Sequence, residues 1–273
     1  MGKYISTSLN HIIILLGLFI MIVPIWIIFA SSTHTSLFIN TNGLQFFLGD
    51  SLIDNYSRVL FKKAGFFNEI TAIKMFLNSF IMALGIATLS VITSLMAAYA
   101  LVYFRIKYAS FFFWLIFITL LVPLELRIMP TYTIMSKLNL VNSYAGLIVP
   151  ISASAIATFF FRQFYRSVPE ELLEAAKLDG TNSWQFFIDF LVPLSKTMIA
   201  AVFIFMFVFG YNQYLWPLIM TTTEQYWTVV MGLKTMYGSI ADRFAFVIMS
   251  MIPPVIIIIF LQKWFVQGIF QSK

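Results

Sequence analysis

Six long apolar runs, separated by shorter polar segments, dominate the pattern of this chain. They lie at about 10–30, 76–103, 111–130, 143–162, 195–218 and 244–263. A helix that crosses the roughly 30 Å hydrocarbon layer of a bilayer needs about 20 mostly apolar residues, because backbone N–H and C=O groups in lipid must be paired within the segment. The pattern therefore predicts an all-α polytopic membrane protein with six transmembrane helices.

The first apolar run follows Lys3 and so shares one feature with a secretory signal peptide. Its length of about 20 residues exceeds the usual apolar region of a signal, and no small-x-small cleavage site follows closely in "SSTHTSLF". We therefore expect a retained transmembrane span.

The composition of the chain supports a membrane location. Of the 273 residues, 60% are hydrophobic and 10% are charged, which is more apolar side chain than a soluble core could cover with polar surface. The net charge of +6 comes from basic residues dispersed along the loops, so we expect a lipid bilayer as partner and no nucleic acid. With both termini inside, nine basic residues fall on the inner side and eight on the outer side, a difference too small to set the orientation.

Residues that could carry chemistry are scarce. The chain has no Cys, which excludes disulfides and thiolate metal sites. His11 and His34 are its only histidines and are expected on opposite sides of the first span, so we predict no metal site. The fragment "GLKT" at 232 lacks the upstream glycine loop that cradles phosphate, and no His/acid cluster or activated Ser appears. We therefore expect this chain not to be an enzyme.

The longest polar connection, about residues 31–75, follows the first run. Its polar clusters and Asn/Gly punctuation predict turns and one short interfacial helix. Connections longer than about 12–15 residues are commonly functional or disordered, so docking of an outside partner is one hypothesis for this loop.

The stretch "EELLEAAKLDG" lies between the fourth and fifth runs and is the most charged part of the chain. Ser167 and Glu170 have the spacing of a capping box, and Pro169 is tolerated in a first helical turn. Gly180 suits the left-handed conformation that follows a last helical turn. We predict a helix over 168–178.

This predicted helix is weakly amphipathic and is followed by a second one. On a 3.6-residue wheel its apolar stripe holds Val168, Leu172, Ala175 and Ala176. The adjacent alanines leave a flat patch that another backbone can approach, with glutamates around it. After Gly180, "TNSWQFFIDFLVP" offers caps at 181–183 and apolar residues at helical spacing, which predicts a short helix along the membrane surface before Pro193.

The residue order in this loop resembles the signature EAA-x3-G-x9-I-x-LP of binding-protein-dependent ABC importer permeases. The matching positions are Glu174, Ala175, Ala176, Gly180 and Pro193, while Phe190 and Val192 stand where Ile and Leu are usual. Stretches between about 76 and 270 are similar to permeases of the sugar type. More narrowly, "LRIMPT", "SYAGL", "SASAIATFFFRQF" and "YNQYLWPL" are similar to the second permease subunit of sn-glycerol-3-phosphate importers.

The resemblance implies a single transmembrane domain, 1–273, with a core at 76–265, an outer loop at 31–75 and a cytoplasmic EAA loop at 163–193. The helix between the fourth and fifth spans would be a coupling helix that sits in a cleft of an ATPase. Its implied coupling residues are Glu174, Ala175, Ala176, Leu178, Asp179, Gly180 and Pro193. Both termini would be cytoplasmic, in the inner membrane of a bacterial cell.

The resemblance also implies partners for this chain. They are a second homologous permease subunit, two copies of an ATP-binding subunit and an extracytoplasmic substrate-binding protein. ATP and Mg would be bound by the ATPase, which leaves no catalytic residue, cofactor or metal in this chain.

The implied substrate is sn-glycerol 3-phosphate or a related glycerophospho compound. Alternatives are a neutral sugar or oligosaccharide carried by the same kind of importer, or a self-contained secondary transporter, although no ionisable group for a proton or sodium relay is evident near the midplane of the spans. Candidate residues of the substrate path are Arg127, Tyr211, Asn212 and Gln213. Arg127 could bind a phosphate or pair with Glu125, and the two amides could line a path or bond neighbouring helices. Asn78 could be a ligand or a packing group.

Overall fold

The computed structural model describes the backbone of residues 2–61, 70–104 and 106–270, so residues 62–69 of the predicted outer loop lie outside the described part. The chain divides into two compact units, Met1–Phe76 with Gly232–Ile252 and Leu77–Met231 with Pro253–Lys273. All regular secondary structure in the described residues is helical, which confirms the predicted fold class.

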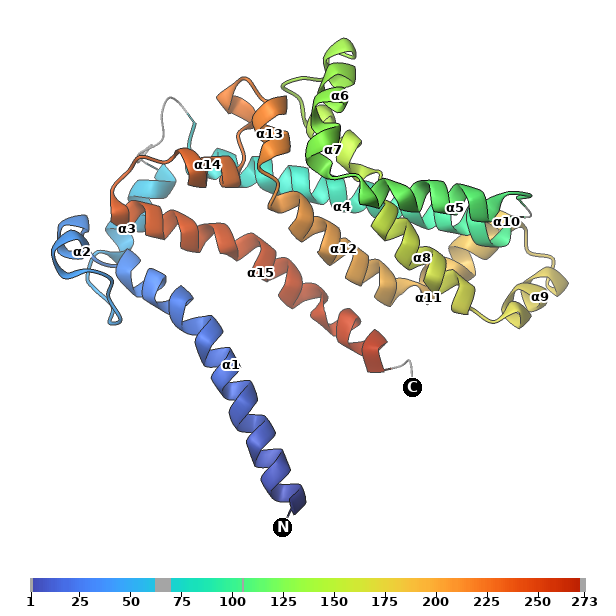
Figure 1. Ribbon diagram of the computed structural model, residues 1–273, viewed down its shortest axis with the longest axis horizontal. Coiled ribbons are helices and arrows are strands. Elements are labelled where there is room, and N and C mark those ends of the chain that lie inside the picture. Colours follow the sequence, from blue (N-terminus) through green and yellow to red (C-terminus); the bar gives the residue numbers. More distant parts are fainter. Residues whose placement is uncertain (1, 62–69, 105, 271–273) are drawn as a thin grey trace. The chain divides into compact units, whose positions relative to one another are not determined.

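The helices are labelled in Figure 1. The first unit contains α1 (Gly2–Ser32), α2 (Ser36–Asn42) and α3 (Leu52–Phe61). Three helices contribute residues to both units, namely α4 (Ala72–Tyr103), α14 (Val229–Thr235) and α15 (Ile240–Phe270). The second unit adds α5 (Ala109–Ile118), η1 (Thr119–Leu121), α6 (Leu124–Lys137), α7 (Tyr144–Ser152), α8 (Ala155–Ser167), α9 (Glu170–Leu178), α10 (Ser183–Gln185), the π-helix η2 (Phe186–Leu191), α11 (Val192–Leu194), α12 (Lys196–Tyr211), α13 (Leu215–Met220) and η3 (Glu224–Tyr226).

Three helices are long and apolar enough to cross a membrane, namely Leu9–Ser32, Ala72–Tyr103 and Ile240–Lys263. Three pairs of helical segments pass the same test together but bend at a short break: Ala109–Leu121 with Glu125–Lys137 by 107°, Tyr144–Ser152 with Ala155–Ser167 by 45°, and Ser183–Leu194 with Lys196–Tyr211 by 74°. The six predicted apolar runs fall on these three helices and three bent pairs. Six spans therefore result where each bent pair crosses the bilayer as one broken span.

In the second unit, α4, α8 and α12 lie side by side, and serines of α4 bond the backbone where α7 breaks into α8 (Figure 1). Ser90 Oγ donates to the carbonyl of Ser152 at 2.9 Å, and Ser94 Oγ donates to the carbonyl of Ser154 at 3.3 Å. The last turn of a helix leaves carbonyls without an intrahelical donor, and an unpaired carbonyl is costly in an apolar layer. These serines therefore allow the helix to break inside the bundle.

Asn78, nearer the start of α4, also bonds backbone carbonyls of irregular segments. Its buried side chain donates through Nδ2 to the carbonyls of Gln225 and Trp227, both at 2.8 Å, and its Oδ1 accepts from the hydroxyl of Tyr144 at 2.7 Å. Asn78 thus joins α4 to α7, to η3 and to Trp227 directly after it. Of the two roles that the sequence left open for it, the structure shows the packing role.

Small residues let helices approach α4 closely. A Cβ on Gly210 of α12 would lie 3.3 Å from the Cα of Ala83, and a Cβ on Gly85 would lie 2.5 Å from Ile148 Cδ1 of α7. Such glycines are the usual means by which backbones pack without a hydrophobic driving force in lipid. The largest buried core side chains around these crossings are Met82, Ile86, Leu147, Phe161, Met206 and Phe207.

The polar loop after α1 forms two helices, α2 and α3, where the sequence predicted one. Buried Asn55 of α3 donates through Nδ2 to the carbonyls of Ser32 and His34, both at 2.8 Å. Arg58 bonds the Oδ1 of Asn55 and also pairs with Asp242 of α15, Nε to Oδ1 at 2.9 Å. Apart from the local bond between Arg58 and Asn55, these bonds join residues 21 to 184 positions apart in the chain, which a local turn pattern does not reveal.

We expect the substitution Asn78→Ala to destabilise the second unit. It removes three hydrogen bonds and leaves buried polar groups without this partner, and each such group costs about 1–3 kcal/mol. The midpoint of thermal unfolding, followed by intrinsic fluorescence, should fall. Asn212→Ala is the control, because Asn212 is exposed and donates to Val208 of its own helix. Equal midpoints for the two variants would contradict the role given to Asn78.

Candidate functional site

The helix α9 begins at Glu170, and the predicted capping box at its start is wrong. Ser167 is the last residue of α8, and its Oγ donates back to the carbonyl of Phe164 at 2.7 Å. Pro169 occupies the N-cap position of α9 without a side-chain hydrogen bond. Val168 is extended (ψ 128°), as expected of a residue before proline, so the chain leaves one helix before it enters the next.

The predicted end of this helix at Gly180 is confirmed. Gly180 has φ +74°, and its N–H donates to the carbonyl of Lys177 at 3.1 Å. The N–H and Oγ1 of Thr181 both donate to the carbonyl of Ala176, at 3.0 and 2.6 Å. The left-handed glycine therefore turns the chain so that the last carbonyls of α9 are paired.

The face that α9 buries differs from the predicted stripe. Ala176 is 1% exposed and Leu173 packs against the core, whereas Leu172 is 42% exposed, Leu178 is 89% exposed and Ala175 is also exposed. Neighbouring residues on a helix are about 100° apart, so two adjacent alanines cannot both face the core. The exposed side of α9 therefore presents Leu172, Ala175 and Leu178 outward.

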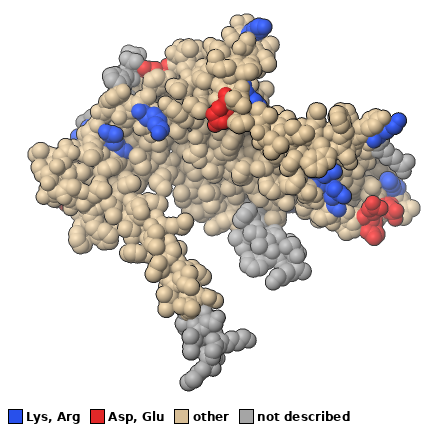
Figure 2. Space-filling model, viewed as in Figure 1, with Lys and Arg blue, Asp and Glu red and all other residues tan. Residues whose placement is uncertain are grey.

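Charged side chains cluster at α9. Figure 2 shows acidic side chains on the surface of this helix. A cavity of about 530 Å³ lies between α9, α8 and the end of α4, and its charged lining residues are Arg162, Arg166, Glu170, Glu174 and Lys177. Glu174 is exposed and forms no ion pair within the described residues. The guanidinium of Arg162 lies 3.8 Å from the ring centre of Phe113. The predicted coupling residue Glu174 thus lines this cavity.

The segment after Gly180 forms a folded elbow. Asn182 and Gln185 make a reciprocal capping box, with both backbone-to-side-chain distances at 2.9 Å, so of the three predicted caps Asn182 is the one used. Buried Phe186 and Phe187 then pack on α4, and the ring centres of Phe187 and Tyr99 are 4.9 Å apart.

Pro193 lies in α11, at the end of this elbow. It stands three residues before α12 begins, on the near side of the 74° bend. At the bend, the N–H of Ser195 donates to the carbonyls of Leu191 and Val192, at 2.9 and 3.1 Å. The elbow therefore runs from α9 into the predicted fifth span without a loose tether.

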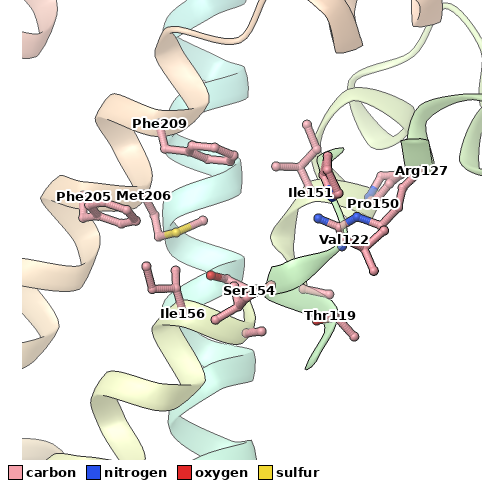
Figure 3. A pocket seen from close by; sticks show the side chains of 14 residues that line it. Thr119, Val122, Arg127, Pro150, Ile151, Ser154, Ile156, Phe205, Met206 and Phe209 are labelled. Carbon is pink, nitrogen blue, oxygen red and sulfur yellow. The ribbon is translucent and has the colours of Figure 1, made fainter. Parts of the chain in front are cut away.

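A second cavity, of about 300 Å³, lies where α7 breaks into α8 and faces α12. Figure 3 shows the guanidinium of Arg127 pointing into it, opposite Phe205, Met206 and Phe209 of α12. The hydroxyl residues Thr119 and Ser154 also line it. Among the described residues that line it, Arg127 is the only charged one, so these residues offer one positive charge in surroundings that are otherwise apolar or hydroxylic.

The other candidates for a substrate path lie elsewhere. Tyr211 is buried and stacks on Phe207, while Asn212 and Gln213 donate to carbonyls of their own helix, those of Val208 and Phe209. None of the three lines the cavity of Arg127. The amides therefore make local bonds within this chain, and their place on a substrate path stays a prediction.

The sequence allowed an ion pair between Glu125 and Arg127, but the structure does not contain it. Residues two apart on a helix do not face each other, and within the described residues the only ion pair joins Arg58 and Asp242. Sequence reasoning missed Thr119 and Ser154 as lining residues. The sequence offered one local sign of Ser154, the polar cluster "SAS" inside an apolar run, which marks a break in the helix. At that break Ser154 caps α8, because its Oγ accepts from the N–H of Ala157.

Comparisons with known proteins agree on one family. The family "Binding-protein-dependent transport system inner membrane component" matches residues 90–271. The chain is similar to the sn-glycerol-3-phosphate transport system permease protein UgpE of Brucella melitensis, with 39% identity and 98% of both chains covered, and to UgpE of Yersinia pestis, with 39% identity and 96% and 95% covered. Its fold is similar to that in the crystal structure of a bacterial ABC transporter involved in the import of the acidic polysaccharide alginate, with a TM-score of 0.80, 22% identity, and 97% and 98% covered.

The substitution Gly180→Ala should loosen the end of α9. A Cβ at Gly180 meets open space, so the change tests the backbone conformation alone. An L-residue in the left-handed region costs about 1–2 kcal/mol, so amide hydrogen exchange at 177–182 should speed up about 5- to 30-fold. Gly17→Ala is the control, because that site is also open but lies inside α1. Unchanged exchange in the Gly180 variant would refute this account of the turn.

Proposed function

Because the chain belongs to the family of binding-protein-dependent transport system inner membrane components, as a permease subunit of an ABC importer, we propose that it carries sn-glycerol 3-phosphate or a related glycerophospho compound. The observation that carries the substrate proposal is its 39% identity, over nearly the whole chain, to permeases named for sn-glycerol-3-phosphate transport. The cavity at Arg127 gives this proposal a physical basis.

A phosphate group suits the chemistry of that cavity. The guanidinium of Arg127 is a planar donor that can hold two phosphate oxygens at once, and charge-assisted bonds of this kind are stronger than neutral ones. Thr119 and Ser154 add hydroxyls, and the aromatic rings of Phe205 and Phe209 give an apolar wall for the carbon skeleton. The volume of about 300 Å³ is at the low end for ligand pockets, which favours a small substrate over an oligosaccharide.

The helix α9 is the proposed coupling helix, with the loop at 163–193 and both termini in the cytoplasm. Its outward side offers Leu172, Ala175 and Leu178, and Asp179 is exposed beside them. Leu172 and Leu178 are 42% and 89% exposed on the same side of α9, and a cleft of an ATPase subunit would bury both. Glu174 can form charge-assisted hydrogen bonds at the edge of the same contact.

The elbow supplies the proposed route from α9 to the substrate cavity. Thr181, the capping box at Asn182 and the packing of Phe187 on Tyr99 join α9 to α10, η2 and α4. The elbow then leads into α12, whose Phe205, Met206 and Phe209 wall the cavity. A shift of α9 with its ATPase would thus move one wall of the cavity, which fits a bundle that alternates between two packings.

The complete proposed importer contains further subunits. It has a second homologous permease, two copies of an ATP-binding subunit that bind ATP and Mg, and an extracytoplasmic substrate-binding protein. This chain contributes half of the pathway and no catalytic residue. Its proposed place is the inner membrane of a bacterial cell.

Leu178→Ser should uncouple ATP hydrolysis from uptake. Burial of a leucine contributes about 1.5–3 kcal/mol, so substrate-stimulated ATP hydrolysis and uptake by the reconstituted complex should fall about tenfold or more. Glu174→Gln should show a smaller loss. The control is Ser167→Ala, since the Ser167 hydroxyl bonds the carbonyl of Phe164 in its own helix. Full coupling by a correctly folded Leu178 variant would overturn the proposed contact.

Arg127→Ala should lower uptake of sn-glycerol 3-phosphate about tenfold or more, because hydrogen bonds to charged groups contribute about 1.5–3 kcal/mol. Arg127→Lys should retain part of the activity, since it keeps the charge but loses the planar fork. Thr133→Ala on the same helix is the control, because Thr133 is exposed and bonds the carbonyl of Met129.

Three results would contradict parts of this proposal. Undiminished uptake of sn-glycerol 3-phosphate by Arg127→Ala would contradict the role given to Arg127. Equal uptake of a neutral sugar by the native complex would favour a neutral-sugar importer. Transport by the purified chain alone, without an ATPase, would indicate a secondary transporter.

A further inference from the structure

We propose that the loop between α2 and α3 in the first unit inserts into the membrane as a lipid anchor, at the bilayer surface next to the C-terminal end of α1. The inserted part is named here the apolar tip. It consists of Leu44, Phe46, Phe47 and Leu48, which are 60%, 52%, 82% and 54% exposed.

The first observation is the depth at which this loop meets α1. The indole Nε1 of Trp26 donates to the carbonyl of Phe46 at 2.9 Å. The candidate span Leu9–Ser32 has 24 residues, about 36 Å of helix, which exceeds the hydrocarbon layer of roughly 30 Å by about 6 Å. Trp26 lies six residues, about 9 Å, before the end of this span. The loop therefore folds back along α1 to the level where hydrocarbon meets headgroups.

The second observation is that three consecutive loop carbonyls, those of Gln45, Phe46 and Phe47, are bonded from within the protein. Besides Phe46, the carbonyl of Phe47 meets Nε2 of His34 at 3.0 Å, and the carbonyl of Gln45 accepts from the hydroxyl of Ser31 at 3.4 Å. The side chain of Gln45 bonds the carbonyls at the end of α2, with Nε2 2.9 Å from Gly43 O. Water can satisfy the carbonyls of an exposed loop, whereas irregular backbone at membrane depth has to find its partners within the protein.

Two loop N–H groups are bonded in the same way. The N–H of Gln45 donates to the hydroxyl of Ser31 at 2.8 Å, and the N–H of Gly49 donates to Thr33 Oγ1 at 2.6 Å. A Cβ at Gly49 would lie 2.5 Å from the His34 ring, so a side chain there would have to displace the ring. The loop is therefore held against the C-terminal end of α1 while its apolar side chains stay exposed.

The third observation is the absence of charge. Residues 36–49, "SLFINTNGLQFFLG", contain no Asp, Glu, Lys or Arg, and Asp50 follows directly. Rims of protein interfaces are polar, whereas segments that enter lipid are apolar and carry aromatic residues at the boundary. Leu37 of α2, 75% exposed, extends the same uncharged surface. Lipid is thus the occupant that these features favour over a protein partner.

The chain has no cysteine, so single cysteines at Phe47 and Leu44 can report on their surroundings. Each is labelled with a nitroxide in the assembled transporter, reconstituted in lipid nanodiscs, with native cysteines of the other subunits replaced by serine. Collision rates with oxygen and with a water-soluble nickel chelate are then measured by electron paramagnetic resonance. A lipid with a nitroxide near its carbonyl calibrates the depth, and Asp54→Cys on exposed α3 is the aqueous control.

Labels at Phe47 and Leu44 should collide severalfold more with oxygen, relative to nickel, than the label at Asp54, at a ratio near that of the lipid standard. A ratio equal to that of Asp54 would place the tip in water and overturn the proposal. Low collision rates with both reagents would show that another subunit covers the tip, which would overturn it as well. Two positions are used so that one misfolded variant does not decide the result.

Discussion

One constraint governs the second unit: backbone groups released where a helix breaks must find new partners in an environment without water. The serines of α4 meet it at the break between α7 and α8, where Ser90 and Ser94 bond the carbonyls of Ser152 and Ser154. Asn78 meets it near the start of the same helix. Because α4 supplies these donors, the neighbouring helices can bend without leaving these carbonyls unpaired.

The candidate cavity lies at one of these breaks. The 45° bend between α7 and α8 falls at residues 153 and 154, which line the cavity opposite α12. The 74° bend before α12 connects that helix to the elbow. The proposed substrate cavity and the proposed coupling route therefore lie at the two ends of α12, so a shift at the elbow would reach the cavity through one helix.

The apolar pattern predicted the helical class and the approximate position of every long segment, because lipid forces a simple rule on composition. It did not predict the bends, since the partners that permit them, such as Ser90 and Ser152, are 62 residues apart. Local chemistry was sufficient for Gly180, whose left-handed turn depends on the residue itself. It failed at Ser167, because α8 extends through that residue and uses its hydroxyl.

In the candidate site, too, features set by local sequence could be predicted, and features set by contacts between distant residues could not. A helical wheel gives the spacing of residues but not which side is buried, so the alanine pair of α9 could be identified while its inward member, Ala176, could not. Arg127 could be singled out by its charge, yet its hydroxyl neighbours Thr119 and Ser154 come from elements that meet only through the bends. The paired carbonyls of the loop at Gln45 to Phe47 follow the same rule as those beside α4. Irregular backbone whose polar groups are bonded within the protein is suited to apolar surroundings, because no water is needed to satisfy it.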